Sequence, residues 1–127
     1  MNFSQAVKSG FKNYATFSGR AARSEYWYWF LFYTIGTWSV LLLQLLIAGP
    51  SNTGSTGQAF VIVQLMFILA TFIPGIAVTF RRLHDLDRSA WWLLIMLIPL
   101  LGPLVLLYWM CVRGTAGSNR FGDDPLA

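Results

Sequence analysis

The chain has 127 residues, of which 56% are hydrophobic and only 11% are charged, and its net charge is +4. A soluble protein of this size buries only about two thirds of its surface, too little to hide so many apolar side chains. Its single cysteine, Cys111, excludes an intramolecular disulfide, and one cysteine with one histidine excludes zinc sites built from repeated Cys and His ligands. The composition therefore predicts an integral membrane protein.

The first 19 residues mix apolar and basic side chains, unlike a signal peptide, in which an apolar run follows a short basic start at once. Aromatic and aliphatic residues recur there at helical spacing: Phe3, Val7, Phe11, Tyr14 and Phe17. Lys8 and Lys12 lie beside this stripe. We expect residues 1–19 to form a short amphipathic helix in the membrane interface with its lysines towards headgroups, the alternative being a loosely packed tail.

Three segments carry no charge, at residues 26–48, 59–80 and 91–112. Each matches the roughly 20 residues that a helix needs to cross the hydrocarbon core. The expected fold is therefore an all-α integral membrane protein with three transmembrane helices, in a single membrane domain of residues 1–127. Residues 113–127, rich in glycine, read as a loop-like tail.

Basic residues set the expected orientation. They precede the first span and recur between the second and third, whereas the first connection, GPSNTGSTGQ, has no charge. The positive-inside rule then places the N-terminus and the second connection in the cytoplasm. With three full crossings, the tail would lie outside.

The third segment contains LIPLLGPL, in which Pro99 and Pro103 each lack an amide donor and Gly102 loosens the chain. Because the prolines are four residues apart, they share one face of a helix, and we expect a kinked but continuous crossing. The alternative is a re-entrant hairpin with its broken backbone buried in protein or lining water. That hairpin would return the tail to the cytoplasm.

Two polar motifs are expected at the cytoplasmic face. GRAARSEYWYWF joins an aromatic belt to basic residues, and RRLHDLDRSAWWLL leads into the third segment. Their charged groups suit anionic lipid headgroups or a partner. The candidate binding residues are Arg20, Arg23, Glu25, Arg81, Arg82, His84, Asp85 and Arg88.

Most of these side chains also have structural partners at helical spacing. Arg81 and Asp85 are four apart and can pair, and Arg88 can lie over Trp91 or Trp92. Asp87 or Ser89 is expected to cap the third helix. Glu25 is expected to bridge to Arg81 or Arg82, which would leave a spare arginine for a lipid phosphate.

Catalytic and metal sites are not expected. His84, Asp85 and Asp87 are three potential ligands, but no fourth lies nearby and the arginines oppose a cation. His84 suits acid–base chemistry but has no visible nucleophile, and three crossings would put Cys111 on the opposite side of the membrane. No span contains a charge, which argues against a proton relay. We expect no cofactor and no enzyme activity.

Three blocks, FSGRAARSEYW, RRLHDLDRSAWW and GTAGSNRFGDDP, resemble the signature of a bacterial integral-membrane family catalogued as domain of unknown function 805. The resemblance runs from about Phe11 to Pro125 and implies a small inner-membrane protein with several helices and no established activity. It also draws attention to a motif in the tail, which we expect to fold back onto another part of the protein. The resemblance favours contact between this tail motif and the Arg, His and Asp residues of the second polar motif. The motif comprises Gly114, Gly117, Asn119, Phe121, Gly122 and Pro125.

The sequence thus predicts a non-enzymatic, multi-pass protein of the bacterial inner membrane with its N-terminus in the cytoplasm. Its expected partners are membrane lipids, and no nucleic acid. The alternative function is a subunit of a homo-oligomeric channel or transporter, because three helices alone enclose too little space for a pore.

Overall fold

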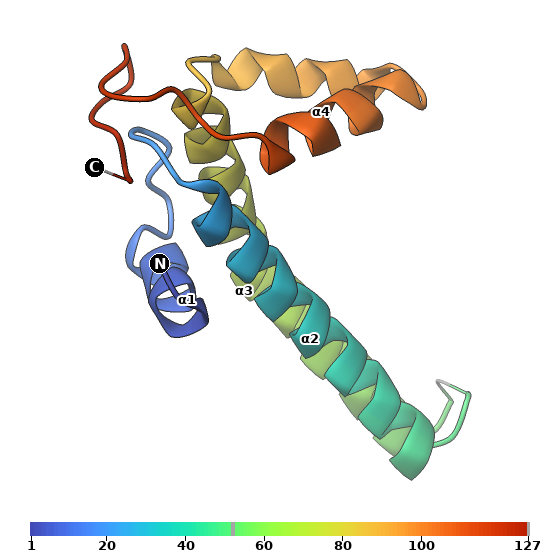
Figure 1. Ribbon diagram of the computed structural model, residues 1–127. Helices are drawn as coiled ribbons and strands as arrows, with labels where there is room; N and C mark the ends of the chain where they lie inside the picture. Colours follow the sequence, from blue (N-terminus) through green and yellow to red (C-terminus); the bar gives the residue numbers. More distant parts are fainter. Residues whose placement is uncertain (52, 127) are drawn as a thin grey trace.

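The computed structural model describes residues 1–51 and 53–126. In chain order its elements are α1 (Phe3–Lys12), α2 (Arg23–Ile47), α3 (Ser55–Asp85), the 3₁₀ helix η1 (Ala90–Leu97) and α4 (Leu101–Cys111). Figure 1 shows α2 and α3 as a long antiparallel hairpin, with η1 and α4 as a shorter hairpin that leaves the end of α3 at an angle. The all-α prediction is confirmed for the described residues.

The long hairpin contains the first two predicted spans, 26–48 and 59–80. Its helices have 25 and 31 residues, hence lengths of about 37 and 46 Å at 1.5 Å per residue. Both are long and apolar enough to cross a membrane. Much of their apolar surface is exposed, with Leu46 at 71% and Leu69 at 69%. An exposed apolar surface of this extent suits hydrocarbon better than water.

The two long helices pack closely where α2 lacks a side chain. The ring of Phe67 fills the place that a Cβ on Gly36 would occupy. Phe67 also stacks on Tyr33, with ring centroids 6.0 Å apart and planes 20° apart. Aromatic packing against a glycine therefore stabilises the hairpin in a part of the molecule that contains no charged residue.

The predicted third crossing, 91–112, is wrong as a single helix. η1 ends at Leu97 and α4 begins at Leu101, so the chain reverses between them. Leu100 has φ 66° and ψ −54°, and the Leu101 amide donates to the Pro99 carbonyl at 2.8 Å. That geometry is a γ-turn of the rare, strained kind. The structure has the helical hairpin instead of the kinked continuous helix.

The physical reason for the reversal lies in Pro99 and Gly102. Pro99 cannot donate the hydrogen bond that a continuing helix needs. A Cβ on Gly102 would overlap the main-chain carbonyl of Ile95, so only glycine lets α4 lie this close to η1. The turn and the close approach together make a compact pair of short arms.

The reversal also corrects the expected position of the tail. The Thr115 amide donates to the Asp85 carbonyl at 2.7 Å, and Arg23 Nη1 donates to the Cys111 carbonyl at 3.1 Å. The tail and Cys111 therefore lie at the same end of the molecule as His84, not across from it (Figure 1).

Helix α1 is shorter than the predicted segment 1–19, since it ends at Lys12 and Tyr14 lies beyond it. Asn2 and Gln5 form a capping box at its start. Its buried face packs on α2, where the rings of Phe11 and Trp29 meet edge to face at 5.2 Å. The lysines at positions 8 and 12 are exposed. The helix is amphipathic as predicted, but part of its apolar face contacts protein.

Candidate functional site

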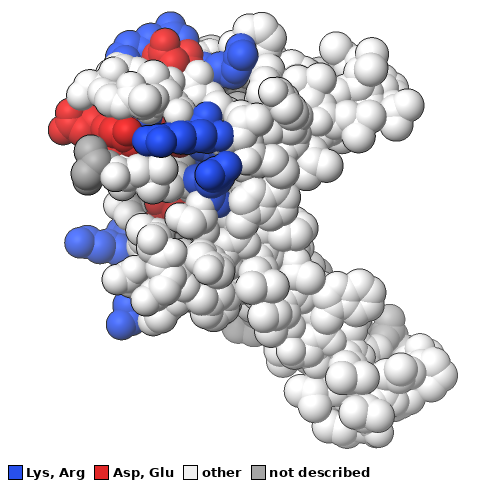
Figure 2. Space-filling view, in the orientation of Figure 1, with Lys and Arg blue, Asp and Glu red and all other residues white. Residues whose placement is uncertain are grey.

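Charged side chains gather at one end of the molecule. Figure 2 shows them at the left and top of the view, over α1, the tail and the connection from α3 to η1, while the far part of the long hairpin and the tip of the η1–α4 hairpin show none. The sequence agrees, because residues 26–80 and 89–112 contain no Asp, Glu, Lys or Arg. We call the region where α1, the start of α2, the end of α3 and the tail meet the charged end.

Asp85 is the centre of the charged end. Its Oδ1 accepts from Arg20 Nε at 3.0 Å, and its Oδ2 accepts from Arg82 Nη1 at 2.6 Å. The exposed fractions of the three side chains are 3%, 1% and 0%, in the order Asp85, Arg20 and Arg82. One buried carboxylate thus pairs with two buried guanidinium groups. The predicted Arg81–Asp85 pair is wrong, because Arg82 occupies that position instead.

Arg81 points to a second buried carboxylate. Its Nη1 donates to Glu25 Oε1 at 2.7 Å, and the Ser9 hydroxyl donates to the same oxygen at 2.8 Å. The predicted bridge from Glu25 to the second arginine motif is confirmed, and its partner is Arg81. Through Ser9, Glu25 and Arg81 the three helices α1, α2 and α3 are tied at one point.

Arg82 also holds the end of the second hairpin. Its Nη2 donates to the carbonyls of Trp109 at 3.0 Å and of Val112, and lies 3.5 Å from the Met110 carbonyl. These are the last carbonyls of α4 and its continuation, which have no partner within the helix. A guanidinium placed there also complements the negative end of the helix dipole. Arg82 therefore fastens α4 to α3.

Arg20 fastens the tail in the same way. Its Nη1 donates to the Gly117 carbonyl at 2.6 Å and its Nη2 to the Thr115 carbonyl at 2.5 Å. Gly114 packs so closely on Asp85 that a Cβ would overlap the carboxylate. The tail motif is thus folded against the buried ion cluster, as expected from the family resemblance.

His84 has a structural environment. Its Nδ1 lies 3.0 Å from the Gly19 carbonyl, and because a carbonyl only accepts, Nδ1 carries a proton. The ring stacks on Phe121 with centroids 4.1 Å apart and planes 4° apart. Asn119 Nδ2 donates to the His84 carbonyl at 2.9 Å. His84 therefore joins the N-terminal loop to the tail.

Arg88 joins the two arms of the second hairpin. Its guanidinium lies 4.3 Å from the ring centroid of Trp109 and 5.6 Å from that of Trp92. The predicted cation–π contact with Trp92 is confirmed. The predicted capping is wrong: Ser89 precedes η1 without a side-chain cap, and Asp87 pairs with Arg120 at 3.2 Å.

The end of the tail is ordered by Asp124. Its carboxylate accepts from the Leu126 amide at 2.9 Å and from the Gly117 amide at 3.0 Å. These two hydrogen bonds lower the pKa of the Asp124 carboxyl below its ordinary value of 3.8. The bond from the Leu126 amide has the larger effect, and the bond from the Gly117 amide follows. Pro125, the last residue of the tail motif, lies exposed in the turn that these bonds close.

The predicted binding residues are therefore brought together, but most of them face one another. Of the eight, Arg23 is the exposed one. Sequence reasoning missed Ser9 and Thr115 because neither a lone serine nor a backbone carbonyl has a recognisable pattern.

The hydrogen bonds and ion pairs of these groups, as described above, are all structural contacts within the described residues. Within residues 1–51 and 53–126, no group of three His, Cys, Asp or Glu side chains is arranged to hold a metal ion. Cys111 is exposed, and its carbonyl accepts a hydrogen bond from Arg23 at the charged end. The absence of an enzyme activity stays a prediction.

Comparison with known proteins identifies the family. Residues 14–123 match the family described as protein of unknown function DUF805. The chain belongs to this family. It is 46% identical to the inner membrane protein YhaH and 43% identical to the inner membrane protein YhaI, both of Escherichia coli K12. Each alignment covers 90% of this chain, and 90% and 89% of the respective relative.

A more distant relative is the uncharacterised protein YiiR of Escherichia coli K12. It is 30% identical over 86% of this chain and 85% of its own length. No solved structure is significantly similar to the chain. The DUF805 resemblance, and with it a membrane protein of uncharacterised role, is confirmed.

Proposed function

We propose that this DUF805 protein is a non-enzymatic, multi-pass protein of the bacterial inner membrane whose charged end lies at the cytoplasmic surface and binds anionic lipid headgroups. The location is supported by two membrane-capable helices and by relatives named as inner membrane proteins. The orientation is supported by the positive-inside rule, since every basic residue belongs to the charged end.

One observation carries the lipid-binding proposal. Lys8, Lys12 and Arg23 are exposed, and within the described residues none of them forms an ion pair with a carboxylate. The lysines lie on the face of α1 opposite Ala6 and Gly10, which pack inward. Basic groups near an anionic leaflet each contribute about 1 kcal/mol to membrane attraction. The buried arginines are already ion-paired with Glu25 or Asp85, and they hold the structure that presents these three.

Lipid enrichment tests the proposal. The protein would be extracted from mixed membranes in polymer nanodiscs, and the ratio of phosphatidylglycerol to phosphatidylethanolamine compared with that of the whole membrane. We expect enrichment for the wild type and a clear reduction for Lys8→Gln/Lys12→Gln. The matched control is Arg113→Gln/Arg120→Gln, which removes the same charge from exposed but ion-paired side chains. Equal ratios in protein and membrane would overturn the proposal.

Cysteine labelling tests the orientation. In a Cys111→Ser background, Ser118→Cys should be protected from an impermeant thiol reagent in intact cells, because the tail lies at the charged end. Ser51→Cys, in the connection between α2 and α3, should be labelled. Labelling of both positions would contradict the two-crossing arrangement.

The alternative function, a homo-oligomeric channel or transporter subunit, is separated by mass. A channel built from one long hairpin per chain needs several copies to surround a pore. A monomer in mild detergent and in nanodiscs would eliminate it, whereas a defined oligomer with ion flux in vesicles would replace the proposal above.

A further inference from the structure

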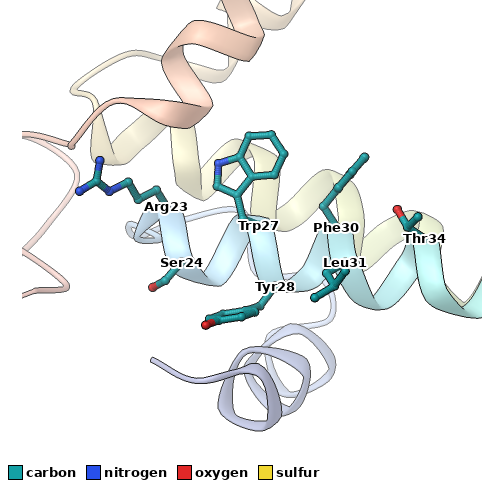
Figure 3. A pocket seen from close by; sticks show the side chains of 7 residues that line it. All are labelled: Arg23, Ser24, Trp27, Tyr28, Phe30, Leu31 and Thr34. Atoms are coloured by element: carbon teal, nitrogen blue, oxygen red, sulfur yellow. The ribbon is translucent and has the colours of Figure 1, made fainter.

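The outer face of α2 carries a groove of about 580 Å³. Figure 3 shows it between α1 on one side and α4 on the other, with its lining side chains all projecting from α2. Arg23 and Ser24 stand at one end and Thr34 at the other. At 1.5 Å per residue that run is about 16 Å long. The groove therefore begins at the charged end and extends towards the uncharged part of the long hairpin.

The groove is bounded by side chains that other elements hold in place. Trp27 Nε1 donates to the Met110 carbonyl of α4 at 2.9 Å, which fixes the indole as one wall. On the opposite side Tyr28 packs edge to face on Phe3 of α1, at 6.1 Å between centroids. Because both walls have partners outside the groove, its shape does not depend on an occupant.

Its interior is apolar and accessible. Phe30 is 49% exposed and Leu31 is 43% exposed, and both lie on the stripe that follows Trp27 at helical spacing. A stripe of this kind beside α1 and α4 suits a flexible hydrocarbon chain lying along the helix. Water-soluble ligands have few polar partners there beyond Arg23 and Ser24.

The polar end is basic and incompletely neutralised. Arg23 uses Nη1 for the Cys111 carbonyl, and within the described residues no carboxylate pairs with it. The positive charge of Arg82 lies close enough to interact with that of Arg23. Arg23 is our candidate for the spare arginine that the sequence predicted. The lining residues include no Asp or Glu, so an ammonium headgroup has no counter-charge in the groove.

We infer that the groove binds a single phospholipid with an anionic headgroup, such as phosphatidylglycerol. Arg23 and the Ser24 hydroxyl hold the phosphate, and one acyl chain follows Trp27, Phe30 and Leu31 towards Thr34. A guanidinium suits phosphate because it presents several donors in one plane. This inference rests on the proposed function and deepens it, from general attraction to a leaflet to one defined lipid site.

Native mass spectrometry of the detergent-solubilised protein tests the site, with phosphatidylglycerol and phosphatidylethanolamine of identical acyl chains added in turn. We expect one phosphatidylglycerol to stay bound at concentrations where phosphatidylethanolamine does not. Arg23→Gln should weaken that binding about tenfold, since a charge-assisted hydrogen bond contributes about 1.5 kcal/mol or more. Leu31→Trp should weaken it too, by filling the groove.

The matched control is Arg120→Gln, another exposed arginine, which lies outside the groove and should leave the affinity unchanged. Circular dichroism and thermal melting verify that each variant folds, as expected for exposed positions. If the wild type binds phosphatidylglycerol but Arg23→Gln and Leu31→Trp bind it equally well, the groove inference fails alone. If the wild type shows no preference for phosphatidylglycerol here or in nanodiscs, the proposed function fails with it.

Discussion

The two helical hairpins of this protein are held together by different forces. The long one, α2–α3, packs the Phe67 ring against Gly36 and Tyr33 in its charge-free part. The short one, η1–α4, is held by Arg82 and Arg88 at its base, with a small apolar cluster of Leu83, Leu106 and Met110 beside them. At 11 residues, α4 is about 16 Å long, too short to cross the hydrocarbon core. The long hairpin is therefore long enough to span a bilayer. The short hairpin is not, and it depends on the buried ion pairs of Arg20, Arg82 and Asp85.

Removal of the Asp85 charge should therefore produce the largest difference in stability between the two hairpins. Asp85→Asn leaves Arg20 and Arg82 buried without a carboxylate, and breaking a buried ion pair from one side costs about 3–5 kcal/mol. We expect the tail and η1–α4 to become sensitive to protease while α2–α3 stays helical. The measurement is limited proteolysis combined with unfolding in a denaturing detergent.

Asp87→Asn is the matched control for that experiment. Its ion pair with Arg120 has side chains 47% and 61% exposed, and exposed pairs contribute about 0–1 kcal/mol. If Asp85→Asn is no more destabilising than Asp87→Asn, the buried cluster does not hold the second hairpin.

Glycine substitutions sharpen the same comparison, with the next largest effect. In Gly102→Ala the new methyl group meets the Ile95 main chain, and overpacking of this kind costs about 1–3 kcal/mol. In Gly36→Ala it meets the end of the Phe67 ring, and a side chain can shift more easily than main chain. We expect a larger loss of stability for Gly102→Ala, measured by the same denaturing titration.

Gly75→Ala provides the reference, because a Cβ there lies at 3.5 Å from the Trp29 indole nitrogen, an ordinary contact. A smaller loss for Gly102→Ala than for Gly36→Ala would show that the short hairpin is the more adaptable of the two.

Phe121→Ala should loosen the tail with a smaller effect. The ring stacks on His84, and aromatic pairs contribute about 0.5–1.5 kcal/mol beyond their burial. We expect faster cleavage after Arg120 without a change in the melting of the long hairpin. Leu126→Ala, at a side chain that is 52% exposed, should behave as the wild type.

The smallest expected effect is a pH dependence at the end of the tail. The pKa of Asp124 is lower in the folded tail than its ordinary value of 3.8, so its contribution to tail stability is fully present above that pH. The contribution is lost as the pH falls through the lowered pKa. Nuclear magnetic resonance of tail amides, Gly117 above all, should show this loss, and Asp124→Asn should remove it.

The sequence predicted what composition and simple spacing determine. Two charge-free runs became α2 and α3, Glu25 met Arg81, and Arg88 met Trp92. These outcomes depend on bilayer thickness, on opposite charges near one interface and on the reach of a side chain along its own segment. They are properties that a linear pattern retains.

The reversal at Leu100 was beyond the reach of such patterns. Leucine has no preference for a positive φ, and a Pro–Leu–Leu–Gly–Pro run fits a kinked helix as well as a hairpin. The choice depended on how closely Gly102 approaches Ile95, which is a tertiary contact. Likewise, Arg82 rather than Arg81 pairs with Asp85, because Arg81 pairs with Glu25, a residue more than fifty positions earlier in the chain.

The reach of Arg20 has a consequence for the time course of assembly. Its guanidinium donates to the carbonyls of Thr115 and Gly117, which lie 95 and 97 residues further along the chain. Because synthesis proceeds from the N-terminus, α2 and α3 are complete well before Thr115 and Gly117 exist. Until then Arg20, Arg82 and Asp85 lack the main-chain partners that enclose them. The charged end therefore closes last, and a chain released early would keep its long hairpin but leave this end open to water and proteases.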